Sequence, residues 1–308
     1  MLRKLLTPLD VVSIGFLSFL ILLCLVFSAR LDVWPWLVLV DLVGVGCILA
    51  LARQAERKPT RLWIGFHRWY CYPIVLLVFK QIYLMVRPIH PIDYDHVFIA
   101  IDRAMFGVDP TVWISQFAHP LLTEILQIAY FSYYILFIVL GVEIYRRLPI
   151  GDFGHAAFMI VYGFYLSYLG YFLMPGVGPR FTLHDFALLG NDLPGLWLTD
   201  TMRKIINAGE SIPAHLPNPQ DYVQRDVFPS GHTQLTLITV ILAFRYKLKS
   251  RVFITVMASL LFIATVYLRY HYVIDLFGGV AFCAVTFWTG DRFQRWWSGE
   301  KKRVNNEF

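Results

Sequence analysis

Two residues near the C-terminal end of the chain have the types and spacing of a catalytic pair. His271 and Asp275 are four residues apart, so on a helix their side chains would share one face. The Asp275 carboxylate could accept a hydrogen bond from one ring nitrogen of His271, which would leave the other nitrogen free as a nucleophile. A polar pair with only a structural role is the alternative, and no further ligand spacing supports a metal site.

A second cluster, Pro229-Ser230-Gly231-His232, directly precedes an apolar stretch with helical periodicity. We expect a helix to begin here, with Ser230 as its N-cap. The N–H groups at a helix N-terminus bind anions, and Gly231 would let the backbone approach a phosphate closely. His232 would lie in the first turn, near that anion. The alternative is a capped helix start with a surface histidine.

Two arginines could complete an anion site. Arg180 follows Gly178-Pro179, and Arg269 lies two residues before His271. Phosphoryl transfer needs cations against the charged oxygens, and the planar guanidinium suits that role. Either arginine alone could anchor a lipid headgroup, but two arginines and two histidines together indicate a phosphate site.

The composition indicates the elements that must position these residues. Of 308 residues, 57% are hydrophobic and 16% are charged, with a mean hydropathy of +0.57, which excludes a disordered chain, a coiled coil and an ordinary cytosolic enzyme. We therefore predict an all-α polytopic membrane bundle of about eight transmembrane helices. The expected spans are 11–29, 35–52, 70–86, 121–145, 155–174, 232–248, 252–269 and 272–290.

The basic residues predict the orientation of these spans. With the N-terminus in the cytoplasm, 18 of the 27 Lys and Arg residues lie on the cytoplasmic side and 8 on the other side. Both termini are therefore expected inside. Arg180, the cluster 229–232 and the segment from Arg269 to Asp275 are all expected on the extracytoplasmic (periplasmic or lumenal) face. The net charge of +6 reflects these cytoplasmic loops, and we expect no nucleic-acid partner. Of the long outer segments, 87–120 is expected to hold short interfacial or re-entrant helices, and 175–231 to cover or build the site.

The motifs resemble those of the type 2 phosphatidic acid phosphatase superfamily, which are K-x6-R-P, P-S-G-H and S-R-x5-H-x3-D. Residues 229–232 match the second motif, and His271-x3-Asp275 followed by Gly278-Gly279 matches the end of the third. The stretches 102–111, 225–233 and 270–272 resemble the branch that includes inositolphosphorylceramide synthases. The resemblance covers about residues 70–290, which predicts two N-terminal helices and a cytoplasmic loop over 1–69, a six-helix catalytic core over 70–290 and a cytoplasmic tail over 291–308.

The resemblance implies a mechanism for these residues. His271 would attack phosphorus and become phosphohistidine, with Asp275 orienting its ring. His232 would protonate the leaving oxygen and then activate water or an alcohol. Ser230 and the N–H of Gly231 would hold phosphate oxygens. Neither a metal nor another cofactor is expected.

The cationic positions depart from the family pattern. The arginine of the third motif should lie six residues before His271, where this chain has Thr265, so Arg269 is the local substitute. Lys80-x6-Arg87-Pro88 matches the first motif literally, but it lies two spans earlier than usual. Arg180 lies where the first-motif arginine normally falls, with Leu173 in the place of the lysine. We favour Arg180 as a substrate-binding residue and keep Lys80 and Arg87 as candidates.

These expectations give a function. The protein would cleave a lipid phosphate or phosphodiester, as a phosphatase with water as the acceptor or as a phosphotransferase with an inositol-like or sugar-like alcohol. Its partners would be that lipid and the surrounding membrane lipids, and the sequence does not identify a protein partner. The alternative, a transporter or lipid flippase, predicts inverted repeats or interrupted helix pairs, which the sequence does not show. A catalytically inactive relative is disfavoured by the intact His232, His271 and Asp275.

Overall fold

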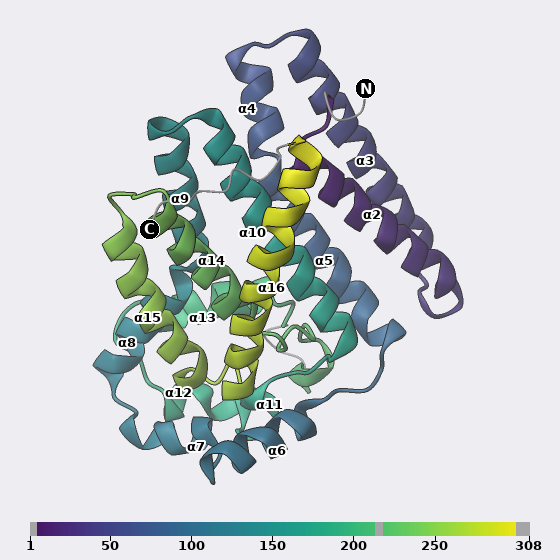
Figure 1. Cartoon of the computed structure of the whole chain (residues 1–308). Helices are drawn as coiled ribbons and strands as arrows, with labels where there is room; N and C mark the ends of the chain where they lie inside the picture. Colours follow the sequence, from purple (N-terminus) through teal and green to yellow (C-terminus); the bar gives the residue numbers. More distant parts are fainter. Residues whose placement is uncertain (1–4, 213–217, 300–308) are drawn as a thin grey trace.

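The computed structural model describes residues 5–212 and 218–299, which are helical with no strand (Figure 1). This confirms the predicted all-α fold class. The predicted tail beyond Gly299 lies outside the described residues. The helices are α2 (Pro8–Val26), η1 (Ser28–Arg30), α3 (Trp34–Arg57), α4 (Arg61–Trp69), α5 (Cys71–Ile89), α6 (Asp95–Phe106), α7 (Pro110–Ile114), η2 (Ser115–Phe117), α8 (Pro120–Phe131), α9 (Tyr133–Arg147), α10 (Ile150–Leu173), α11 (Pro179–Thr182), η3 (Phe186–Leu188), α12 (Leu189–Asp192), α13 (Thr199–Gly209), η4 (Pro219–Asp221), α14 (Gly231–Arg245), α15 (Arg251–Tyr267) and α16 (Val273–Ser298).

Each of the eight expected spans corresponds to helix, but not all of these helices are long enough to cross a membrane. Among the described residues, five segments have the length and composition of a span, or six when the bent pair α8–α9 is counted as one. These helices are those of an integral membrane protein. The difference from eight lies in α14 and α15, which have 15 and 17 residues, whereas a full span needs about 20.

The helix α10 lies at the centre of the bundle, where α2, α5, α9, α14 and α16 pack against it (Figure 1). Its sequence is apolar on every side, and a helix of that kind is stable only when other helices surround it. α14 also packs against α15 and α16. The two elements that carry His232 and Asp275 are therefore neighbours in the core.

Short helices close one end of the bundle. We use the name cover for α6, α7, α11 and α12, which lie together at the end opposite α4 (Figure 1). The segment 87–120 thus forms short helices, as expected, and the described parts of the second outer segment, 175–212 and 218–231, contain several short helices. Glu124 of α8 fixes the neighbouring α13, because its carboxylate accepts hydrogen bonds from the backbone N–H groups of residues 196–199.

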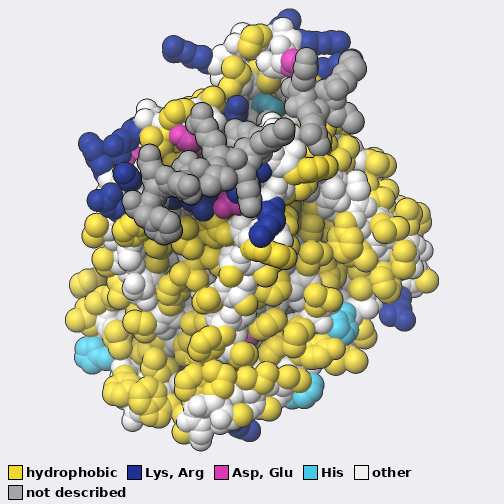
Figure 2. Space-filling view, viewed as in Figure 1, with side chains coloured by type: hydrophobic (Ala, Val, Ile, Leu, Met, Phe, Trp, Pro, Cys, Tyr) yellow, Lys and Arg dark blue, Asp and Glu magenta, His cyan; other side chains and the backbone are white. Residues whose placement is uncertain are grey.

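Basic side chains gather at the other end of the molecule, around α4 and the last turns of α3, α9 and α14 (Figure 2). We call this the basic end. Its exposed cations include Arg53, Arg57, Lys58, Arg61, Arg146, Arg147 and Arg251. The charge asymmetry in the sequence is therefore also an asymmetry between the two ends of the bundle.

Candidate active site

The N-terminus of α14 is built as the sequence predicts. The Oγ atom of Ser230 accepts a hydrogen bond from the N–H of Thr233 at 3.2 Å, which confirms Ser230 as the N-cap. The N–H of Ser230 donates to the backbone oxygen of Asp275 at 3.0 Å, so α14 and α16 begin side by side. Gly279 allows this approach, since a Cβ there would lie 2.8 Å from the backbone oxygen of Ser230.

Gly231 begins α14 and faces a crowded environment. A Cβ at this position would lie 2.6 Å from the hydroxyl of Tyr171 on α10. The glycine thus brings the start of α14 against α10. Gly231 and His232 both line the same cavity, described below, so this turn borders open space as well as the helix core.

His271 lies just before α16 rather than on it. α16 begins at Val273, so the two residues do not share a helix face; Asp275 lies in the first turn and its Oδ2 atom points back toward the ring. The Nδ1 atom of His271 lies 3.0 Å from the backbone oxygen of Val227 and 3.4 Å from Oδ2 of Asp275. The same Oδ2 atom accepts a hydrogen bond from the N–H of Tyr272 at 2.8 Å.

These contacts determine the tautomer of His271. A carbonyl oxygen can only accept a hydrogen bond. Nδ1 of the His271 ring therefore carries a proton and donates to the backbone oxygen of Val227. The Nε2 atom then carries the lone pair of the ring, and this lone pair faces His232. Burial lowers the pKa of His271 from 6.5 to about 4, so the ring is neutral at physiological pH. A neutral imidazole with a fixed tautomer is the form that can act as a nucleophile.

The two histidines meet directly. Nδ1 of His232 lies 3.3 Å from Nε2 of His271, with the ring centroids 5.4 Å apart. Tyr130 and Tyr133 both pack against the His232 ring, at centroid distances of 4.5 and 4.4 Å. Both tyrosines flank Ser132, where α8 and α9 meet at an angle of 46°. The two tyrosines against His232 therefore come from the two helices that meet at this bend.

Arg180 joins the same stack of rings. Its guanidinium carbon lies 4.6 Å from the centroid of the Tyr270 ring, and Tyr270 stacks on Tyr130 at 4.2 Å. The side chain is buried and forms an ion pair with Glu210, which follows α13. Its Nη1 atom is buried without a hydrogen-bond partner among the described residues. Arg180 thus lies on the same aromatic stack as His232, with one nitrogen still able to donate.

Arg269 is oriented differently from the sequence expectation. Its guanidinium donates to Oδ2 of Asp192 at 2.7 Å and to Oγ of Ser115 at 3.3 Å, so its charge is paired within the cover and the adjoining η2. The residue has a φ of +67°, and its backbone oxygen accepts the N–H of Arg180 at 3.1 Å. The structure therefore links Arg269 to Arg180 through the backbone, whereas its guanidinium binds elsewhere. Thr265 bonds through Oγ1 to the backbone oxygen of Phe262.

The two residues that match the first motif literally, Lys80 and Arg87, have different partners in the structure. Nζ of Lys80 bonds to the backbone oxygen of Gly209 and to Oγ of Ser211, on either side of the residue that pairs with Arg180. Arg87 instead binds Asp221 at an exposed rim, where about half of each side chain is accessible to solvent. Lys80 and Arg180 therefore converge on one turn, and Arg87 lies apart from it.

Two aspartates that the sequence analysis did not assign position the loops of the site. Asp95 accepts hydrogen bonds from the N–H groups of Val177 and Gly178, just before Arg180, and from the hydroxyl of Tyr272. Asp102 accepts from the N–H groups of residues 273 and 274, in the first turn of α16. Both come from α6. Aspartates in an otherwise apolar segment were the available signal, but their partners lie more than 80 residues away.

Asp226 is a further acidic residue that was not assigned. It lines the cavity next to His232, and burial raises the pKa of its carboxyl group above the ordinary value. In residues 5–212 and 218–299, no group of three or more His, Cys, Asp or Glu side chains could hold a metal ion. The absence of a metal or cofactor from the reaction stays a prediction.

Comparison with known proteins gives one match. The family model of the PAP2 superfamily matches residues 96–289, from the start of α6 to the middle of α16. No curated protein and no solved structure shows a significant match to the chain. The matched range includes both histidines, Asp275 and Arg180, and it excludes Lys80 and Arg87.

Proposed function

The chain belongs to the PAP2 superfamily, and from this premise we propose that it is a membrane enzyme that cleaves a lipid phosphate or phosphodiester through phosphohistidine. Membership in a superfamily of phosphatases supports phosphatase-type activity on a lipid phosphate in general. The observation that carries the specific proposal is the contact of 3.3 Å between His232 and His271 beside the buried Arg180. Such a contact supports the proposal that the two imidazoles act on one phosphate.

In the first step, Nε2 of His271 forms a bond to phosphorus and the bond from phosphorus to the leaving oxygen breaks. His232, protonated at that stage, gives its proton to the leaving oxygen. Val227 and Asp275 hold the Nδ1–H group, so the positive charge that develops on His271 is stabilised where it forms. In the second step, His232 takes a proton from water or an alcohol, which attacks phosphorus and releases His271.

The phosphoryl group has to separate the two rings. An in-line attack distance of 3–3.5 Å, the bond from phosphorus to the leaving oxygen and a hydrogen bond of 2.6–3.2 Å to that oxygen together require roughly 7 Å between the nitrogens, whereas they lie 3.3 Å apart in the structure. Arg180 would bind the equatorial oxygens once Glu210 is displaced from it. Ser230 and the N–H of Gly231, at the N-terminus of α14, would receive the remaining negative charge.

We further propose that the site faces the extracytoplasmic side and that both termini are cytoplasmic. The basic end of the molecule supports this orientation, since cytoplasmic loops carry the excess of Lys and Arg (Figure 2). The cover lies at the opposite end. The acceptor remains part of the proposal: the branch resemblance favours an inositol-like or sugar-like alcohol, and water would give a phosphatase.

One observation supports the transporter alternative. The helices α8 and α9 form a bent pair, which the sequence did not predict. Transporters of that design have such pairs in corresponding positions of two repeats. The bend here has another explanation, since it places Tyr130 and Tyr133 against His232. We therefore keep the enzyme as the proposed function.

The test is turnover of phosphatidic acid by the purified protein in nanodiscs, with and without added myo-inositol, followed by mass spectrometry of the products. We expect vanadate-sensitive release of phosphate or formation of an inositol phosphate, and neither with His271→Ala. Equal turnover by wild type and His271→Ala would contradict the proposed nucleophile.

A further inference from the structure

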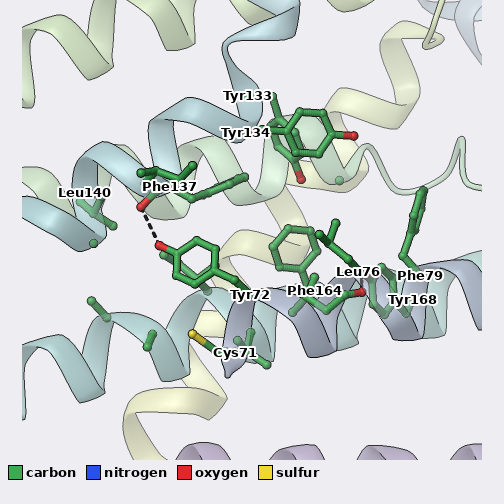
Figure 3. A pocket seen from close by; sticks show the side chains of 18 of the residues that line it. Cys71, Tyr72, Leu76, Phe79, Tyr133, Tyr134, Phe137, Leu140, Phe164 and Tyr168 are labelled. Atoms are coloured by element: carbon green, nitrogen blue, oxygen red, sulfur yellow. Dashed lines mark hydrogen bonds between the residues drawn. The ribbon is translucent and has the colours of Figure 1, made fainter. Parts of the chain in front are cut away.

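A narrow apolar cavity of about 220 Å³ leads away from the histidine pair between α5, α9 and α10. Gly231, His232 and Asp226 line the end near the site. The rest of the lining is uncharged and consists of aliphatic and aromatic side chains, several of which are shown in Figure 3. We call this cavity the slot. Because His232 is part of the wall, one end of a molecule in the slot would lie against this histidine.

The slot is long compared with half a bilayer. Its lining residues on α10 run from Phe153 to Tyr171, about 27 Å at the helical rise per residue. On α5 and α9 they span Cys71–Phe79 and Tyr133–Gly141, about 12 Å each. Half of the hydrocarbon core measures about 15 Å. A chain that starts at His232 and follows α10 therefore passes the bilayer midplane.

One side of the slot is open to the membrane. Leu76 on α5 is 56% exposed and Ile138 on α9 is 49% exposed, although both line the cavity. An apolar opening on a lipid-facing surface admits a hydrocarbon chain from the membrane. A free phosphate would lose its hydration there without gaining a polar partner. The opening thus indicates a lipid as the occupant.

The slot is narrow at its far end. The hydroxyl of Tyr72 on α5 donates to the backbone oxygen of Phe137 on α9 at 2.9 Å and crosses the gap between these helices (Figure 3). Beyond it, a Cβ at Gly141 would lie only 2.6 Å from the same hydroxyl. A cavity of about 220 Å³ over this length has no room for two chains side by side.

We propose that the slot binds one aliphatic chain of the lipid phosphate and that the enzyme prefers a substrate with a chain long enough to pass the bilayer midplane. This inference rests on the proposed function, since it places the phosphate of that lipid at His232. It adds α5, which lies outside the range matched by the superfamily, to the residues that recognise the substrate.

The test compares octyl phosphate with docosyl phosphate as substrates for wild type and two variants. Leu76→Trp places an indole in the open side of the slot. Leu77→Trp is the matched control, because Leu77 is also exposed, at 42%, and does not line the cavity. We expect the ratio of kcat/KM for docosyl over octyl phosphate to fall at least ten-fold in Leu76→Trp and to stay within two-fold of wild type in Leu77→Trp. Equal ratios in all three proteins would contradict the proposal that the slot binds the aliphatic chain of the substrate.

A labelling experiment separates failure of this inference from failure of the proposed function. Docosyl phosphate with a diazirine at the chain terminus is photolysed with wild-type protein and with His271→Ala, and labelled peptides are identified by mass spectrometry. We expect label on the lining residues at the far end of the slot, among 71–72, 137–141 and 153–157, in both proteins, whether or not turnover occurs. Label confined to other lipid-facing helices would overturn the slot, whereas label in the slot without turnover by wild type would contradict only the enzyme.

Discussion

The ion pair between Arg180 and Glu210 makes a prediction whose size follows from the structure. Arg180 is 5% exposed and Glu210 is 14% exposed, so solvent screens the pair only weakly. A phosphate that binds both terminal nitrogens of Arg180 has to displace this carboxylate from Nη2, since only Nη1 has no partner among the described residues. In Glu210→Gln the amide oxygen can still accept a hydrogen bond, but the competing negative charge is gone.

A hydrogen bond to a charged group is worth about 1.5–3 kcal/mol. At 1.4 kcal/mol for each factor of ten, Glu210→Gln should bind vanadate about 10- to 100-fold more tightly than wild type. Vanadate affinity is measured by inhibition of turnover and, independently, by the shift in thermal unfolding of the purified protein.

The matched control is Asp221→Asn, the same chemical change in the same outer segment. Asp221 pairs with Arg87 at an exposed rim, so vanadate affinity should stay within two-fold of wild type. Unchanged or weaker vanadate binding in folded Glu210→Gln would refute the idea that Glu210 occupies the place of a substrate oxygen at Arg180.

Three further predictions concern the histidine and the two arginines. Asp275→Asn should lower kcat by about two to four orders of magnitude, by analogy with other carboxylates that orient a catalytic histidine, with KM nearly unchanged; a loss below ten-fold would contradict that role. Arg180→Lys should weaken vanadate binding at least ten-fold, and Arg269→Lys less than three-fold, because the Arg269 guanidinium binds Asp192 in the cover whereas Arg180 lies on the aromatic stack with His232; equal losses would show that both arginines contact the anion. Because burial lowers the pKa of His271 to about 4, the neutral nucleophile persists as the pH falls through 6.5 and is lost only near pH 4; the rate of phosphoenzyme formation from p-nitrophenyl phosphate should follow that profile, and a midpoint near 6.5 would contradict it.

The sequence predicts the helical class and the cap of α14 because these depend on local patterns. Apolar periodicity indicates helices, and Ser230 before Gly231 is a local signal that the structure reproduces as an N-cap. The contact between His232 and His271 was expected from the two motifs and their family resemblance, and the structure brings the two rings together.

The remaining features of the site depend on contacts between distant residues. The direction of the Arg269 side chain follows from a turn with positive φ after α15, and sequence spacing carries no information about that turn. The bend at Ser132, which brings two tyrosines to His232, has neither a proline nor a glycine at the break to mark it. Asp102 caps a helix that begins 171 residues later, so its partner could not be identified from the sequence.

The length of the predicted spans shows a related limit. Hydropathy predicts span 232–248, but α14 ends at Arg245, and the chain turns at Lys247, which has a φ of +50°. Span 272–290 is extended instead, because α16 continues to Ser298 and ends before Gly299 in the left-handed region. Caps and turns set these boundaries, whereas hydropathy averages over them.

The central claim is tested most directly by trapping the covalent intermediate. Wild-type protein is mixed with a lipid phosphate, quenched at alkaline pH within the first turnover, digested and analysed by tandem mass spectrometry. The account predicts a phosphoryl group on His271, more of it in His232→Ala with a substrate that has a good leaving group, and none in His271→Ala. A phosphoryl group on another residue, or turnover without any phosphoenzyme, would contradict it.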